Sequence, residues 1–142
     1  MRNVVGIGFM LCRDSVKQKK MKSYKDLEVY SLGLELFYKC HSYSLKLPKH
    51  EMYELGSQLR RSSDSVSTNI VEGYGRKKYK ADFVKFLTYS YSSCLETVFH
   101  IEKIAKLYPE IIENEQEFIN RYNELSAKIY NFIKYVEDNW KT

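Results

Sequence analysis

The feature that most constrains the fold is the long segment from Tyr79 to Leu107, in which apolar residues recur every three or four positions. Neither proline nor glycine interrupts it, and the spacing is that of an α-helix with one apolar face. At about 1.5 Å per residue, the predicted helix is about 40 Å long. Its apolar stripe consists of Phe83, Leu87, Tyr91, Cys94, Val98, Ile101 and Ala105.

Two further segments, one near each end of the chain, have the same period. The first opens at Ser23, where Asp26 provides a weaker form of the capping box, and it stops at Leu47–Pro48. Its predicted core stripe is Leu27, Tyr30, Leu34, Phe37, His41 and Leu45. The last segment follows Pro109 and a Glu-rich lead-in, and its stripe is Phe118, Tyr122, Leu125, Ile129, Phe132, Val136 and Trp140.

A fourth helical segment begins near His50 and ends at Gly73 or Gly75. Small serine and threonine residues fill much of its length, so it can approach its neighbours closely. We therefore expect it to lie inside the bundle. Its predicted stripe is Tyr53, Leu55, Leu59, Ser62, Val66 and Ile70.

The connections between these four segments are short, which places neighbouring helices antiparallel. The prediction is an all-α fold, an antiparallel up-down-up-down four-helix bundle over residues 21–142. Residues 1–20 carry five basic side chains against one acidic and precede a second methionine, Met21. We expect them to be a disordered N-terminal extension and Met21 to be the natural beginning of the domain.

The cysteine pattern and the absence of a long apolar run bear on the compartment. Cys12, Cys40 and Cys94 are odd in number and far apart, which favours reduced thiols over a disulfide framework or a metal site. No stretch approaches the roughly 18 apolar residues that a membrane-spanning helix needs. We expect a cytoplasmic protein that does not contact a membrane.

The formal net charge of +5 is unevenly distributed along the chain. Residues 60–85 carry seven basic groups against three acidic, whereas residues 110–138 carry three against seven. The folded part is thus dipolar rather than uniformly basic, and the overall charge alone does not indicate a nucleic-acid surface. The acidic lead-in of the last helix has two interpretations. It either complements the positive end of that helix or pairs with the basic segment of another copy in a head-to-tail ring. Its members are Glu110, Glu113, Glu115 and Glu117.

The sequence EGYGRKK, residues 72–78, admits two interpretations. A phosphate-binding loop needs a strand before its glycines and a helix after them. Here the glycines follow a helix, and the Walker spacing is missing. The favoured interpretation is a helix end at which Gly73 or Gly75 adopts the left-handed conformation, and this segment is the predicted bend between two long helices.

The basic density around this bend suggests a contact with nucleic acid. Arginine and lysine can neutralise phosphates, and tyrosine can stack on unpaired bases. The alternative is a solvated charged face. The candidate contact residues are Arg60, Arg61, Tyr74, Arg76, Lys77, Lys78, Tyr79 and Lys80, of which Arg60 and Arg61 lie about three to four helical turns from the rest.

No constellation of catalytic or metal-binding residues is present in the sequence. Asn69 and Glu72 are one turn apart, and we expect them to bond each other, a cap or a neighbouring helix. Glu96 and His100 lack the spacing and the second copy of a di-iron site. We therefore expect no catalytic residue, metal or cofactor, and a protein that is not an enzyme.

Three stretches, MKSYKDLEVYSLGLELFYKC, SQLRRSSDSVSTNIVEGYGR and KIYNFIKYVEDN, resemble the 23S rRNA-intervening-sequence protein family, also called four-helix bundle proteins. The resemblance covers residues 21 to about 139. The positions that match the central motif are Gln58, Leu59, Arg60, Arg61, Asn69, Ile70, Glu72, Gly73, Tyr74, Gly75 and Arg76.

This resemblance implies an antiparallel bundle that assembles as a homo-oligomeric ring, with a pentamer favoured. A related branch of the family is the accessory variability determinant of diversity-generating retroelements, a basic ring that works with a reverse transcriptase and RNA. The leading hypothesis is a non-enzymatic RNA-binding module. The alternatives are a scaffold that recruits a partner such as a reverse transcriptase, and a ring interface in which Arg60 and Arg61 pair with acids of the next subunit.

Overall fold

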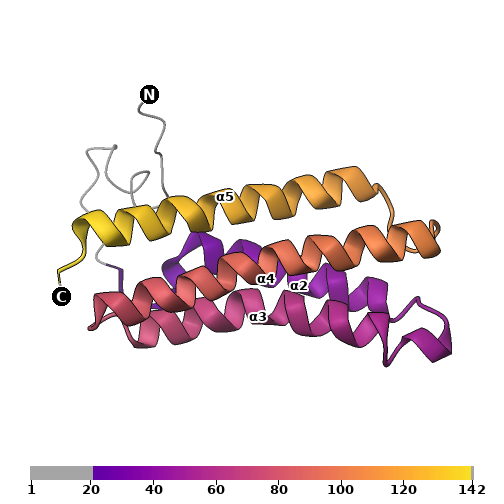
Figure 1. The fold of residues 1–142 in the computed structure, drawn as a ribbon, viewed down its shortest axis with the longest axis horizontal. Coiled ribbons are helices and arrows are strands. Elements are labelled where there is room, and N and C mark those ends of the chain that lie inside the picture. The colour runs from indigo at the N-terminus through magenta and orange to yellow at the C-terminus, as the bar shows by residue number, and fades with distance from the viewer. Residues whose placement is uncertain (1–20, 142) are drawn as a thin grey trace.

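The computed structural model describes residues 21–141, and these form four long helices joined by short connections (Figure 1). A short 3-10 helix η1 (Tyr24–Asp26) precedes α2 (Glu28–Ser44), and a second one, η2 (Lys49–Glu51), precedes α3 (Leu55–Gly75). The chain then forms α4 (Lys80–Leu107) and α5 (Glu115–Asn139). Successive helices pack antiparallel and α5 returns to α2, which confirms the predicted four-helix bundle. The prediction for residues 1–20 lies outside the described residues.

The start of the bundle follows the sequence closely. The Ser23 hydroxyl accepts from the Lys25 backbone N–H at 3.2 Å, and the Asp26 carboxylate accepts from the Ser23 N–H at 3.1 Å. This reciprocal pair is the expected capping box. It caps η1, however, and α2 begins only at Glu28. In the same way η2 forms near the predicted start at His50, while α3 itself begins at Leu55.

The core face of α2 is not the one that the sequence analysis predicted. Its buried residues are Val29, Leu32, Gly33, Leu36, Cys40 and Ser44. Of the predicted stripe, Leu27 is buried at the helix start, but Tyr30, Leu34 and Phe37 are half-buried and Leu45 is 54% exposed. His41 is exposed as well. The helix therefore carries two apolar faces, and the bundle covers only one of them.

Helices α3 and α4 pack most extensively, as the small residues of α3 led us to expect. The Ser90 hydroxyl donates to the Val66 carbonyl at 2.7 Å, and the Ser93 hydroxyl donates to the Ser65 hydroxyl at 2.9 Å. A serine side chain is short, so these bonds form only where the axes of α3 and α4 are close together. Leu59, Val66 and Ile70 are fully buried beside them, as predicted, although Tyr53 of the same stripe is 77% exposed.

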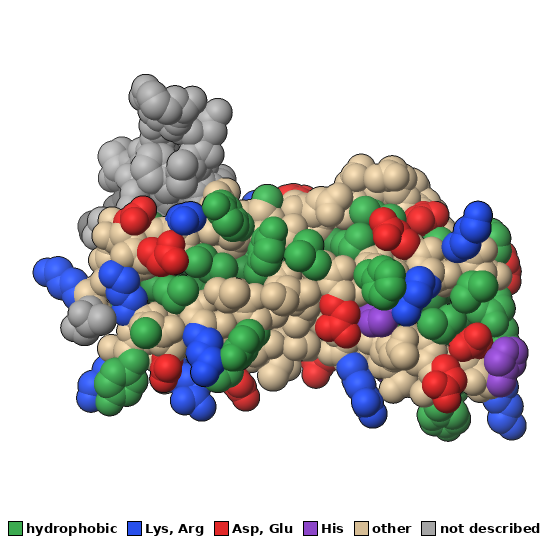
Figure 2. Space-filling view, viewed as in Figure 1, with side chains coloured by type: hydrophobic (Ala, Val, Ile, Leu, Met, Phe, Trp, Pro, Cys, Tyr) green, Lys and Arg blue, Asp and Glu red, His purple; other side chains and the backbone are tan. Residues whose placement is uncertain are grey.

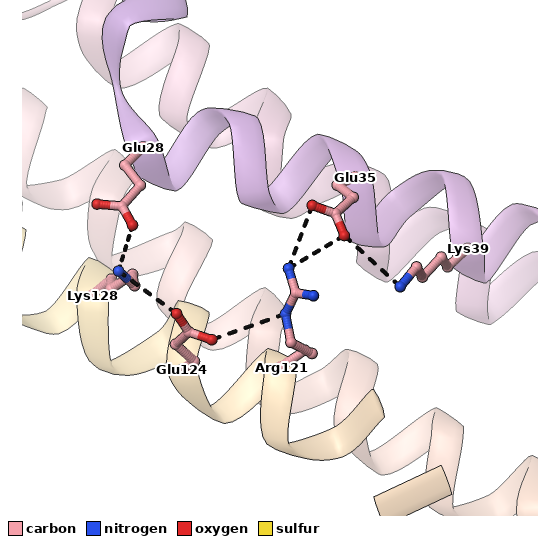
Figure 3. Close-up of polar contacts among 6 residues, drawn as sticks. All are labelled: Glu28, Glu35, Lys39, Arg121, Glu124 and Lys128. Atoms are coloured by element: carbon pink, nitrogen blue, oxygen red, sulfur yellow. Dashed lines mark hydrogen bonds and ion pairs between the residues drawn. The ribbon is translucent and has the colours of Figure 1, made fainter. Parts of the chain in front are cut away.

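The α2–α5 seam is bridged by charged side chains (Figure 3). The Arg121 guanidinium reaches both oxygens of Glu35 at 3.2 and 3.4 Å, and the Lys128 amine pairs with Glu28. Glu124 links the two cations within α5. These pairs are partly exposed, so each contributes at most about 1 kcal/mol. Arg121 and Lys128 are thus engaged by carboxylates of the same chain.

Candidate nucleic-acid interface

The candidate interface is built on the reversal between α3 and α4. Gly73 and Gly75 both lie inside α3, and no glycine among residues 21–141 has a positive φ, so the predicted left-handed glycine cap is wrong. The chain turns at residues 76–79 instead, just beyond the predicted bend. The Arg76 N–H donates to the Glu72 and Gly73 carbonyls at 3.2 and 3.0 Å, which satisfies the end of the helix with ordinary backbone angles.

Gly73 is required for another reason, which is the close approach of α4. A methyl group at Gly73 would lie 3.0 Å from Cβ of Phe86 and 3.3 Å from the ring of Phe83. Nothing lies within 4 Å of the equivalent position at Gly75. The glycine thus lets the two helices meet where the chain turns, and the turn places the basic run at the end of the bundle.

The cations at this turn lie over aromatic rings rather than in buried ion pairs. The Lys77 amine is 3.7 Å from the centre of the Tyr74 ring, and the Arg76 guanidinium is 4.9 Å from that of Phe86. Arg76 also approaches Asp82 at 3.9 Å, with both side chains about half exposed. Within residues 21–141, Lys77, Lys78 and Lys80 form no ion pair with a carboxylate. Their charge is available to a ligand.

The two predicted stacking tyrosines have different environments. Tyr79 is 61% exposed at the start of α4, and the Lys78 amine lies 5.6 Å from its ring centre, which leaves most of the ring accessible for stacking on a base. Tyr74 is only 9% exposed, because Lys77 covers its face and Tyr24 packs against it with ring centres 6.2 Å apart. Of the two, only Tyr79 is positioned for contact with a ligand.

Trp140, which the sequence analysis assigned only to the core stripe, also holds the basic turn. Its indole N–H donates to the Lys77 carbonyl at 2.8 Å, and its ring meets Phe83 edge-on at 5.4 Å. The bond ties the end of α5 to residues 76–79. The sequence does carry a signal for this contact. Trp140 stands at the end of the α5 stripe, and in an antiparallel bundle the end of α5 is level with the α3–α4 bend.

Arg60 and Arg61 are not part of this cluster. The Arg60 guanidinium donates to the Ser44 hydroxyl and to the Met52 carbonyl, both at 2.9 Å, and so braces the α2–α3 connection. Arg61 is exposed on α3. Both precede Arg76 by about four turns, or roughly 22 Å along the helix. The structure therefore brings together only Arg76, Lys77, Lys78, Tyr79 and Lys80, which we call the basic turn.

The remaining motif residues divide between packing and solvent. Leu59 and Ile70 are fully buried, while Gln58 and Glu72 are exposed. The Asn69 amide donates to the Ser65 carbonyl at 2.8 Å and to the Ser65 hydroxyl at 2.9 Å. This corrects the expected bond to Glu72, a cap or a neighbouring helix, because Asn69 bonds back within α3. The bonded Ser65 hydroxyl also accepts from Ser93, so the pair supports the α3–α4 contact.

Two cysteines, Cys40 and Cys94, are buried in the interior, and their thiols are poor nucleophiles. Burial raises the pKa of Cys40 to about 12, although a hydrogen bond with the Tyr122 hydroxyl at 3.2 Å opposes this, and burial raises that of Cys94 to about 12. Thiols with such pKa values carry almost no nucleophilic thiolate near neutral pH.

Within the described chain, no group of three or more His, Cys, Asp or Glu residues is placed to hold a metal ion. No helix between residues 21 and 141 is long and apolar enough to cross a membrane.

The acidic lead-in lies at the other end of the bundle. The α4–α5 connection joins η2 there, where the Tyr108 hydroxyl donates to Glu51 at 3.1 Å. With 28 residues, α4 separates this end from the basic turn by about 42 Å. Figure 2 shows Lys and Arg side chains projecting at the end of the molecule that carries the α3–α4 turn, with acidic side chains among them. The bundle is therefore dipolar along its axis.

Comparison with known proteins agrees with this architecture. The model of the 23S rRNA-intervening sequence protein family matches residues 25–131. The fold is similar, with a TM-score of 0.65, to a crystal structure of a Bacteroides thetaiotaomicron protein of unknown function from the S23 ribosomal protein family. The two sequences are 21% identical over 75% of this chain and 95% of the other.

None of the curated proteins matches the sequence. The Bacteroides likeness concerns the fold, and neither matching description names a reaction. The family model covers well over half of the chain, including α2, α3, α4 and most of α5. The chain therefore belongs to the 23S rRNA-intervening sequence protein family.

Proposed function

We propose that this protein is a non-enzymatic, homo-oligomeric RNA-binding module that contacts single-stranded RNA through its basic turn. The observation that carries the proposal is the set of lysines at residues 77, 78 and 80, which have no carboxylate partner within residues 21–141, with the exposed Tyr79 among them. The lysines would neutralise phosphates, and the tyrosine would stack on a base. The association of the family with 23S rRNA intervening sequences supports RNA as the ligand.

The test is a titration of a fluorescent single-stranded RNA at several salt concentrations. The double variant Lys77→Gln with Lys78→Gln should bind more weakly. Its plot of log affinity against log salt should be shallower by about 1.4, because each phosphate contact to a single strand contributes about 0.7. The matched control is Lys46→Gln with Lys49→Gln, which removes the same charge from two exposed lysines at the opposite end.

Tyr79 gives a second, independent arm of the same test. Tyr79→Ala should lower affinity by about 1–3 kcal/mol and leave the salt dependence unchanged, because stacking releases no counterions. If the lysine pair and its control at residues 46 and 49 weaken binding equally, the attraction is general and the basic turn is not the contact. If the wild-type protein retains no RNA at low salt, the proposal fails.

A scaffold that recruits a protein partner, such as a reverse transcriptase, is the second candidate. The observation in its favour is that large apolar side chains are exposed on α2 and α4, including Tyr38 at 62% and Phe99 at 57%. A scaffold predicts a stable complex in a pull-down with that partner and no retention of RNA. The same titration therefore separates the two functions.

A further inference from the structure

Lys77 lies where the start and the end of the described chain meet the basic turn. Its amine is 3.7 Å from the centre of the Tyr74 ring, and Tyr24 of η1 packs against the same ring, with ring centres 6.2 Å apart. The Lys77 carbonyl accepts from the Trp140 indole N–H at 2.8 Å, just beyond α5. Figure 1 shows the α3–α4 turn, the start of the described chain and its C-terminal end at the same end of the bundle. Three segments that are far apart in the sequence therefore converge there.

The two converging segments bring further lysines to the basic turn. Lys22 and Lys25 lie on either side of Tyr24, and Lys141 directly follows Trp140. All three lysine side chains are exposed, and none forms an ion pair within residues 21–141. Because the two aromatic residues are anchored to the turn, these lysines are held at the end of the bundle that carries it.

The carboxylates at this end do not balance the cations. Residues 22–26, 72–82 and 138–141 together carry seven basic side chains against four acidic. Two of the acids already have partners. Asp26 accepts from two backbone N–H groups at the start of η1, and Asp82 approaches the arginine of the turn at 3.9 Å. The surface made by the three segments therefore keeps an excess of positive charge, and its lysines are available to an anionic ligand.

Each of the three segments also places an aromatic ring beside its lysines. Tyr79 of the turn is 61% exposed, whereas Tyr24 and Trp140 are half-buried. Cations that follow a backbone, together with rings on which bases stack, are the combination that binds single strands. A duplex keeps its bases stacked inside and offers a protein mainly its shape and backbone. The ligand class that fits this surface is thus single-stranded RNA.

We propose that the RNA site is a composite of three segments, in which Lys22 and Lys25 of η1 and Lys141 beyond α5 bind phosphates together with the basic turn. The inference deepens the proposed function and rests on it. Lys22 and Lys141 lie outside residues 25–131, which the family model matches, so this chain supplies part of the site beyond the matched region. A strand that crosses all three segments contacts more phosphates than the turn alone, which steepens the salt dependence of binding.

The test compares the salt dependence of single-stranded RNA binding among full-length variants. Lys25→Gln with Lys141→Gln, one lysine from each converging segment, should make the plot of log affinity against log salt shallower by about 1.4, because each phosphate contact contributes about 0.7. Adding the two substitutions of the basic turn should bring the total loss of slope to about 2.8. The matched control is Lys46→Gln with Lys49→Gln, which removes the same charge from exposed lysines at the opposite end.

Trp140 provides a second readout, because it is the only tryptophan in the chain. Unlabelled RNA that crosses the turn and the end of α5 should change the Trp140 emission over the same concentration range in which it binds. RNA bound at the opposite end of the bundle would lie about 42 Å away along the 28 residues of α4 and would leave the emission unchanged.

The outcomes separate this inference from the proposed function. If Lys25→Gln with Lys141→Gln behaves like its control while the basic-turn double variant lowers the slope, the site is confined to the turn, and only the composite is wrong. Binding without a change in Trp140 emission also overturns the composite. Equal affinity for an RNA duplex of the same length overturns the ligand class. If the wild-type protein binds no RNA at low salt, both the composite and the proposed function fail.

Discussion

Gly73 leaves little room for a side chain, because the position of its missing methyl group lies 3.0 Å from Cβ of Phe86 on the facing helix. Gly75, one residue before the turn, faces open space in the same helix. Gly73→Ala should therefore lower the free energy of unfolding by about 1–3 kcal/mol through overpacking. Gly75→Ala should raise it by about 0.4–1 kcal/mol, since alanine restricts the unfolded chain.

Urea unfolding followed by circular dichroism measures both variants against the wild type. Each glycine serves as the control for the other, because the substitution and the helix are the same and only the surroundings differ. A left-handed cap at Gly75 would make its substitution by alanine destabilising. A loss of stability in both variants would therefore contradict the helical geometry of residue 75.

His100 is the one buried histidine among the described residues, and it should make stability depend on pH. It is 6% exposed, its Nδ1 has no hydrogen-bond partner within residues 21–141, and burial lowers its pKa although Glu96 at 3.4 Å opposes the shift. The unfolded state has a pKa of about 6.5 and binds the proton more readily. The contribution of His100 is complete above that pH and is lost as the pH falls through the lower folded pKa.

The measurement is the urea midpoint between pH 7.5 and 5.5 for the wild type and for His100→Gln. The midpoint of the wild type should fall on acidification, and the variant should show a flatter dependence. His41 and His50 are exposed and remain in both proteins, so their contributions cancel. A wild type that gains stability relative to the variant at pH 5.5 would show that Glu96 holds the imidazolium form.

At the scale of single helices, the sequence determined the number, direction and approximate ends of the four helices, because long uninterrupted periods leave few alternatives. The core face of α2 could not be read in this way. Residues 27–47 contain two apolar periods, one through Leu32, Leu36 and Cys40 and the other through Leu34 and Leu45. Periodicity shows that a face is apolar but not whether the same chain covers it.

The candidate site shows a similar division between local and tertiary information. The basic turn was predictable, since its residues are adjacent in sequence and a short connection must lie on the surface. The role of Arg60 was not, because its partners are Ser44, at the end of α2, and Met52, within the α2–α3 connection. The purpose of Gly73 was hidden for the same reason, as it depends on Phe83 and Phe86 of the facing helix.

At the scale of the whole molecule, the self-association and the RNA binding of the proposed function would reinforce each other. The bundle is dipolar, with the basic turn at one end and the acidic lead-in at the other. If subunits associate with their axes parallel, every basic turn lies at the same end of the assembly. A single turn offers only a few cations, so one subunit alone should bind weakly. Several turns at one end can contact one RNA strand together, which raises the apparent affinity without any new kind of contact.

Disrupting the assembly should therefore weaken RNA binding even when no basic residue is changed. Tyr38→Glu and Phe99→Glu each place a carboxylate at an exposed aromatic position, on α2 and on α4 respectively, and neither residue belongs to the basic turn. Sedimentation should give each variant a mass near the 16.9 kDa of one chain. Apparent RNA affinity should fall by about 10²-fold or more if two or more turns act together.

The control is Tyr53→Glu, which introduces the same charge at an exposed tyrosine outside α2 and α4 and should change neither mass nor affinity. Circular dichroism checks that all three variants keep their helix content. The informative comparison is the salt dependence: a single subunit neutralises fewer phosphates, so its slope should be shallower than that of the assembled wild type. Variants that sediment as single chains yet keep the wild-type affinity and slope would show that each basic turn acts alone, and self-association would then have no part in RNA recognition.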